Sequence, residues 1–110
     1  MKKTSEINFK ITLDENHVPE KIDWEASDSG EEGMKECKAF IMSLWDKKES
    51  NTLRIDLWTK EMMIDEMQHF FYQSIITMSD TYERATNDKE LAEEMREFGK
   101  TMGEKIKSRM

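Results

Sequence analysis

Polar and apolar residues alternate along two stretches near the start of the chain, a pattern typical of β-strands with one buried face. The first stretch covers residues 5–13 and the second covers residues 20–26. Between them lies a segment rich in turn-forming residues, which includes the only proline, Pro19. The pattern therefore predicts two antiparallel strands joined by a turn.

A β-hairpin is predicted within residues 43–60, and we expect the rest of the chain to be organised around it. Alternation is regular over residues 52–59, where Arg54, Asp56 and Trp58 lie on the side opposite the aliphatic residues. A polar loop of hairpin length precedes this strand. Beyond Trp58 the period changes from two residues toward 3.6, so the hairpin is expected to lead into helices.

Residues 34–45 fit either of two elements. As a helix, this segment would place Cys37, Ile41 and Trp45 on one face; as a strand, it would be apolar on both faces. Because the run is short and is followed by a loop of hairpin length, we predict a strand over residues 37–46. Such a strand would be central in its sheet, with both faces covered.

The last part of the chain has helical periodicity. Apolar residues recur at spacings of three and four over residues 63–86 and again over residues 88–108. Asn87 and Glu90 have the spacing of a capping box that would begin the second helix. Gly99 and Gly103 are read as two residues that weaken this helix, or alternatively as a place where another backbone approaches.

Together these elements predict the α+β class and a single domain over residues 1–110. We expect a four-stranded antiparallel sheet, with strands near 5–13, 20–26, 37–46 and 52–59, followed by two C-terminal helices packed on one face. An acidic, glycine-containing loop near residues 27–34 is expected to be flexible.

Composition narrows the choice of partners. The net charge is −7 and the pI is about 4.9, which disfavours nucleic acid and anionic membrane surfaces as partners. Hydrophobic residues (36%) are no more frequent than charged ones (37%), so burial of apolar surface against a second chain is expected. The single cysteine, Cys37, excludes an internal disulfide and fits a reducing compartment. No apolar run has the length of a membrane span or a signal peptide, and we predict a cytoplasmic protein without membrane insertion.

No set of residues in the sequence forms a recognisable catalytic or metal-binding motif. Glu66 and His69 have the spacing of half a di-metal motif, but a second such pair is absent. A surface pair of carboxylate and imidazole explains them, and an enzyme or ligand-binding domain built on Glu66 and His69 is the competing hypothesis. Glycine-rich nucleotide motifs and an activated nucleophile are also missing. We predict that the protein is not an enzyme and uses no metal or cofactor.

The surface pattern indicates binding to proteins. The apolar part of the first helix is wider than one sheet face can cover, which predicts self-association, with a dimer as the simplest case. Trp58 is a candidate anchor on the hairpin, and the pattern leaves open whether it lies in the core or at an interface. The candidate partner-binding residues are Trp58, Arg54, Asp56, Phe70, Tyr72 and Ile76.

Several unusual strings of residues resemble the GldC family of gliding-motility proteins from Bacteroidetes. The strings are DENHVPEKI at 14–22, SLWD at 43–46, TLRIDLWTK at 52–60, DEM at 65–67 and SDTY at 79–82. The resemblance covers nearly the whole chain. The resemblance implies an accessory cytoplasmic component of the motility machinery, with no catalytic residues to carry over. The chain departs from the family at residues 62–64, where relatives often carry a proline before the helix.

The sequence thus favours a non-catalytic adaptor that contacts components of the motility machinery or of an associated secretion machinery. The alternative is a small acidic secretion chaperone that binds unfolded clients. The predicted plan of four strands and two helices looks like that of the export chaperone SecB, although the two share no motif.

Overall fold

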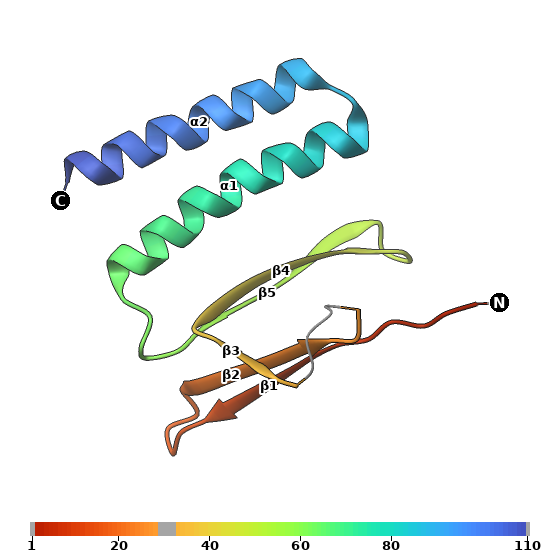
Figure 1. The fold of residues 1–110 in the computed structure, drawn as a ribbon, viewed down its shortest axis with the longest axis vertical. Coiled ribbons are helices and arrows are strands. Elements are labelled where there is room, and N and C mark those ends of the chain that lie inside the picture. The colour runs from red at the N-terminus through yellow and green to blue at the C-terminus, as the bar shows by residue number, and fades with distance from the viewer. Residues whose placement is uncertain (1, 29–32, 110) are drawn as a thin grey trace. The chain divides into compact units, whose positions relative to one another are not determined.

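The computed structural model describes residues 2–28 and 33–109 (Figure 1). The chain divides into two compact units, the first ending at Met62 and the second beginning at Met63. All strands belong to the first unit and both helices belong to the second. The α+β class with two C-terminal helices is confirmed, whereas the single domain and the packing of the helices on one sheet face stay predictions. The predicted flexible loop falls largely on residues 29–32, which lie outside the described residues.

The first sheet contains three antiparallel strands in the order β1-β2-β3. They are β1 (Ile7–Leu13), β2 (Pro19–Ala26) and β3 (Lys35–Cys37). Ile22 stands at the centre of this sheet, opposite Ile11 on one side and Cys37 on the other. Its side chain is fully buried. Ile22 is therefore the main core residue of the sheet.

The predicted four-stranded sheet is wrong, because the strand expected over residues 37–46 is divided at Lys38. Before Lys38 the chain pairs with β2, and after it β4 (Ala39–Asp46) pairs with β5 (Asn51–Trp58) in a separate two-stranded sheet. The choice of strand over helix for this segment is confirmed. Apolar residues on both faces are compatible with either sheet, so the pattern could not show where the chain changes its pairing partner.

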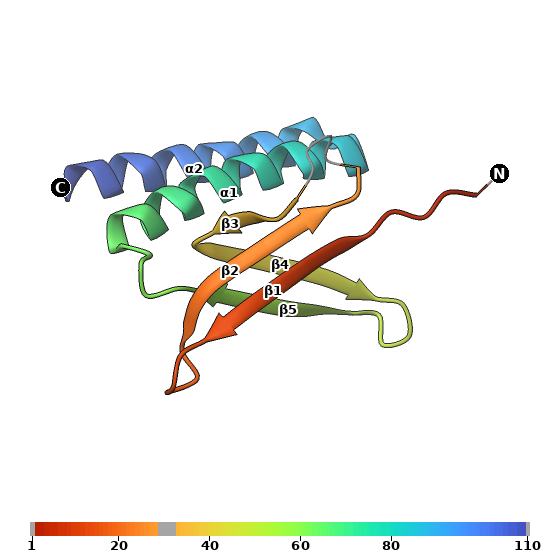
Figure 2. The same ribbon diagram turned by 60° about the horizontal axis from the view of Figure 1, so that its bottom comes forward.

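The two sheets contact each other through aromatic side chains. The rings of Phe9 in β1 and Phe40 in β4 stack with 4.8 Å between their centroids, and Figure 2 shows that the strands of the two sheets run in different directions. The expectation that the strand over 37–46 is central with both faces covered is wrong. Within the described chain β4 has β5 as its only partner, and the side chain of Trp45 is 71% exposed.

An aspartate organises each hairpin turn. The Asp14 carboxylate accepts hydrogen bonds from the amides of Asn16 (2.8 Å) and Val18 (3.0 Å) in the turn between β1 and β2. The Asp46 carboxylate accepts from the amides of Lys48 (3.1 Å) and Glu49 (2.7 Å) in the turn between β4 and β5. Such side-chain acceptors satisfy the turn amides that no strand partner can reach.

Asp14 also forms an ion pair with Lys60, at the end of the same unit. The Lys60 ammonium, together with the Val18 amide, holds the pKa of the Asp14 carboxyl below its ordinary value of 3.8. We expect Asp14→Asn to lower stability at pH 7 and to lose this effect in acid. Since the pKa is lowered on folding, the contribution of Asp14 is present above pH 3.8 and disappears as the pH falls through the folded-state pKa.

Urea unfolding of the wild type and of Asp14→Asn between pH 2 and pH 7 measures the difference in their free energies of unfolding. Glu15→Gln removes the same charge from the same turn and is the matched control, expected to change stability little at any pH. A difference between wild type and Asp14→Asn that stays constant over the whole pH range would contradict the role given to the carboxylate.

The second unit is an antiparallel pair of helices, α1 (Ile64–Thr86) and α2 (Lys89–Ser108) (Figure 1). The predicted capping box at Asn87 is wrong. Asn87 instead ends α1 in the left-handed conformation (φ 61°), and the side chain of Asp88 caps α2 by accepting from the amide of Leu91 at 3.0 Å. Asn is one of the few residues that adopt this conformation readily, so the connection can be very short.

Small residues allow the two helices to approach closely. A Cβ atom added at Gly99 would lie 2.7 Å from Cδ1 of Ile76, and one added at Gly103 would lie 2.7 Å from Cε1 of Tyr72. Ser79 and Ala92 are fully buried as well. The two glycines are therefore a place of close approach, as the alternative interpretation expected, but side chains of α1 and not another backbone contact α2 there.

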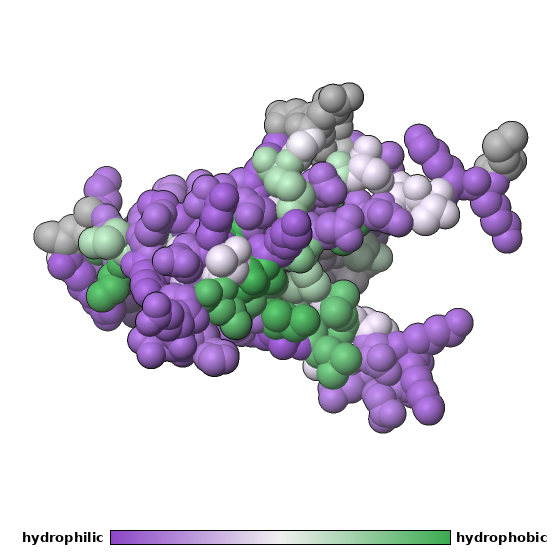
Figure 3. All heavy atoms as spheres, turned by 90° about the horizontal axis from the view of Figure 1, so that it is seen from below, coloured by the Kyte–Doolittle hydropathy of each residue, from purple (hydrophilic) through white to green (hydrophobic). Residues whose placement is uncertain are grey.

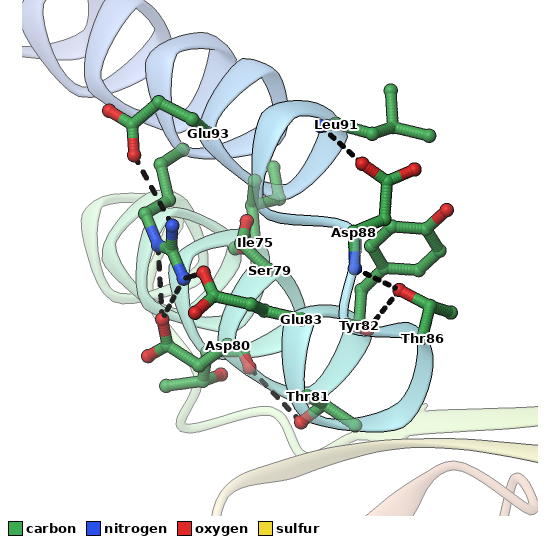
Figure 4. Close-up of polar contacts among 12 residues, drawn as sticks. Ile75, Ser79, Asp80, Thr81, Tyr82, Glu83, Thr86, Asp88, Leu91 and Glu93 are labelled. Carbon is green, nitrogen blue, oxygen red and sulfur yellow. Dashed lines mark hydrogen bonds and ion pairs between the residues drawn. The ribbon is translucent and has the colours of Figure 1, made fainter.

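A single arginine connects the helices on their polar side. The guanidinium of Arg96 donates to Glu83 at 2.7 Å, to Asp80 at 3.1 Å and to Glu93 at 3.2 Å. Figure 4 shows the three carboxylates directed at the same guanidinium group. These carboxylates raise the pKa of Arg96 further above its usual range. Since two of them belong to α1, the cluster fixes the pairing of the helices by charge as well as by shape.

Candidate protein-binding surface

The hairpin residues singled out by the sequence share one exposed face of β5. Trp58 is 55% exposed, and the side chains of Arg54 and Asp56 are 54% and 48% exposed. The two charged groups lie 3.6 Å apart, from Nε of Arg54 to Oδ2 of Asp56. This face therefore combines an accessible indole with a weak surface ion pair that solvent screens.

A second indole lies on the same face of the hairpin. In the β4–β5 register Trp45 stands opposite Thr52, and Ala39 stands opposite Trp58. Because directly opposed residues point to the same side of a sheet, Trp45 and Trp58 lie toward opposite ends of one face. Sequence reasoning missed Trp45 as a candidate, although the alternation along residues 39–45 already placed it on a defined strand face.

The other face of the hairpin is apolar and only partly covered. Phe40 on this face contacts Phe9, but toward the tip Leu44, Leu53 and Ile55 are each about half exposed (48%, 50% and 48%). Figure 3 shows apolar side chains gathered in a strip that runs toward the tip of the hairpin. The hairpin thus presents apolar groups on both of its faces.

The helical candidates Phe70, Tyr72 and Ile76 all belong to α1, so they lie in a different unit from the hairpin candidates. All three line one hollow of about 460 Å³ on α1. Tyr72 and Ile76 also contact the α2 glycines, and both are only half-exposed. These two residues contribute to the pairing of the helices in addition to any role at the surface.

A more exposed apolar face of the helical pair lies elsewhere and was not singled out from the sequence. Met78 in α1 and Phe98 in α2 are 60% and 62% exposed. Together with Ile75 and Met95 they line a hollow of about 330 Å³. All four belong to the apolar stripes that the helical period predicts over residues 63–86 and 88–108, but the buried residues of α2 are Ala92 and Gly99, and Phe98 remains exposed.

The residues considered for metal or acid–base chemistry have structural roles or lie apart. The Glu66 carboxylate accepts from the amide of Met63 at 3.0 Å and thereby caps α1. His69 lines a groove of about 570 Å³ between α1 and α2, whose wall also holds Lys100 and Lys107. No group of three His, Cys, Asp or Glu side chains with the arrangement of a metal site occurs among the described residues. Burial raises the pKa of the Cys37 thiol, which disfavours the nucleophilic thiolate.

Comparison with known proteins identifies one family. The family model described as gliding motility-associated protein GldC-like matches residues 19–108. No curated protein and no solved structure matches the chain. Over the residues that the structure describes, neither helix has the length and apolar character needed to cross a membrane.

Proposed function

The chain belongs to the GldC-like family of gliding motility-associated proteins, and from this premise we propose that it is a non-catalytic, cytoplasmic adaptor of the gliding machinery. Its work is to hold another protein of that machinery, or of an associated secretion system, through direct contacts. The residues proposed to make those contacts are Trp45, Arg54, Asp56 and Trp58 on the hairpin and Phe70, Met78 and Phe98 on the helices.

The observation that supports this proposal most strongly is the exposure of large apolar side chains in both units. Trp45, Trp58, Met78 and Phe98 each expose more than half of their surface. Monomeric proteins rarely leave such groups clustered in solvent without a binding function. Tryptophan in particular is enriched among the residues that dominate the energy of protein interfaces.

The chemistry of the chain supports a role without catalysis. Glu66 is occupied in capping a helix, and Arg96 forms ion pairs with Asp80 and Glu83 across the helical pair. These arrangements stabilise the helices and engage the charged groups in structural contacts. A binding role therefore requires fewer assumptions than an enzymatic one.

Site-specific cross-linking in a gliding bacterium that carries this protein tests the proposal. A photo-reactive phenylalanine analogue replaces Trp58 in one variant and Phe98 in another, and replaces the exposed Lys105 in the control. We expect one dominant cross-linked partner from at least one of the first two positions and none from the third. We also expect Trp58→Ala to slow gliding while changing the free energy of unfolding by less than about 1 kcal/mol, since the side chain is largely exposed.

The identity of the cross-linked proteins separates the two functions considered. An adaptor yields the same folded partner in repeated experiments, and the Trp58→Ala variant loses it. A chaperone yields many partners, enriched in newly made and unfolded chains. Equal labelling at all three positions, together with unchanged gliding of Trp58→Ala, would overturn the proposal.

A further inference from the structure

The outer edge of β5 is an unused template for strand pairing. Within the described chain β5 pairs with β4 only, and seven of its eight residues are classed as exposed. A two-stranded sheet is marginally stable by itself. Unpaired backbone groups along an exposed strand favour pairing with another strand.

The hydrogen bonds of the hairpin identify which backbone groups point outward. The amide of Thr59 donates to the carbonyl oxygen of Lys38 at 2.8 Å, toward the β4 side. Since the direction of backbone groups alternates from one residue to the next, those of Leu53, Ile55 and Leu57 also point toward β4. The outward groups therefore belong to the alternate residues, namely Thr52, Arg54, Asp56 and Trp58.

The side chains at these outward positions are complementary to a second copy of the same strand. In a two-fold antiparallel pair, the outward backbone groups of one copy form hydrogen bonds with those of the other. Four registers allow this, and they place Arg54 opposite Thr52, Arg54, Asp56 or Trp58 of the second copy. The register centred on Ile55 places Arg54 opposite Asp56, and symmetry then places Asp56 opposite Arg54. Two ion pairs form in this register, whereas the neighbouring register centred on residue 54 opposes two arginines.

We propose that the protein forms a homodimer in which β5 pairs with β5 of a second copy about Ile55, joining the two hairpins into one four-stranded sheet. This assembly goes beyond the proposed adaptor role and does not depend on which motility partner is bound. It brings Leu53 opposite Leu57 of the second copy, so that apolar side chains now half-exposed cover one another. On the other face, Trp58 lies in the same cross-strand row as Thr52 and Trp45 of the second copy. The dimer thus builds a surface with two indoles at each end.

Disulfide trapping in the purified full-length protein tests the register. With Cys37→Ser as background, Ile55→Cys places two thiols at directly opposed positions that are not hydrogen-bonded, where Cα atoms are about 4.5 Å apart. This distance permits a disulfide, and we expect most of the protein to become a cross-linked dimer under mild oxidation. Leu53→Cys is the matched control, because its two copies would lie about 13 Å apart along the strands. Equal cross-linking of the two variants, or none in Ile55→Cys, overturns the proposal.

Charge reversal tests the ion pairs independently by sedimentation equilibrium. Arg54→Asp and Asp56→Arg each place like charges opposite one another twice per dimer, and each is expected to raise the dimer dissociation constant about tenfold or more. An equimolar mixture of the two variants, and the double variant carrying both changes, should return to within about threefold of the wild type, since opposite charges face each other again. Circular dichroism monitors folding of each variant. A wild type that stays monomeric, or folded double and single variants with equal dissociation constants, contradicts the proposed interface.

Discussion

Replacing Ile22 with Ala is expected to destabilise the protein by about 2–5 kcal/mol, the largest effect of any single truncation in the sheets. Ile22 is the largest apolar side chain that is fully buried. It stands between Ile11 and Cys37 in the three-stranded sheet, so neither neighbour can move far without losing its own strand pairing. The cavity left by the substitution would remain largely unfilled.

Chemical denaturation of a graded series measures this effect. Ile22→Val removes one methylene group and should cost about 0.5–1.5 kcal/mol. Ile7→Ala makes the same truncation as Ile22→Ala in the same sheet, at a side chain that is 68% exposed, and should cost far less. Equal destabilisation by Ile7→Ala and Ile22→Ala would show that Ile22 is not a core residue of the first unit.

Replacing Gly99 with Leu is expected to destabilise the helical pair by about 1–3 kcal/mol. A Cβ atom at this buried position would lie 2.7 Å from Cδ1 of Ile76 and 3.2 Å from Cγ2 of Ile75, and Leu adds three further carbon atoms beyond it. Removal of a helical glycine contributes at most about 1 kcal/mol in the opposite direction. Overpacking therefore decides the sign, because the helices must separate to admit the side chain.

Thermal unfolding followed by circular dichroism at 222 nm measures this loss. Lys100→Leu introduces the same side chain at the next, exposed residue of α2 and should leave the melting temperature almost unchanged. Combining Gly99→Leu with Ile76→Ala vacates part of the space that the new side chain needs. The double variant should then cost less than the sum of the two single changes. Strict additivity would show that Gly99 and Ile76 are not in contact.

The alternation of residues predicted most of the strands because it reflects a local property, the burial of one strand face. Residues 5–13 and 52–59 became β1 and β5 with boundaries shifted by two residues or fewer at each end. The break at Lys38 left no mark in this pattern. Where a strand changes its partner depends on which other strand is nearby, and β2 and β5 are distant from each other in sequence.

Part of the candidate surface was predictable, because the alternation of residues also shows which side chains share one face of a strand. Trp58, Arg54 and Asp56 were located on one strand face by period alone, and their exposure follows from the small size of the sheet that contains them. Phe98 looked like a residue of the packing stripe, yet it is 62% exposed. A helical stripe shows which residues are apolar. Which of them face the neighbouring helix depends on the rotation of the helix about its own axis, and that rotation is set by the closest packing that the two helices can reach.

The sequence by itself determined the class, both helices and most of the strands, the acidic character and the family of this protein, since each is expressed in residue types and their spacing. The tertiary structure decided the division into two sheets, the close contact at Gly99 and Gly103, and the convergence of Asp80, Glu83 and Glu93 on Arg96. These features depend on residues that are far apart in the chain and come together only after folding. Their energies arise from packing and from charge at short distance, which no local pattern encodes.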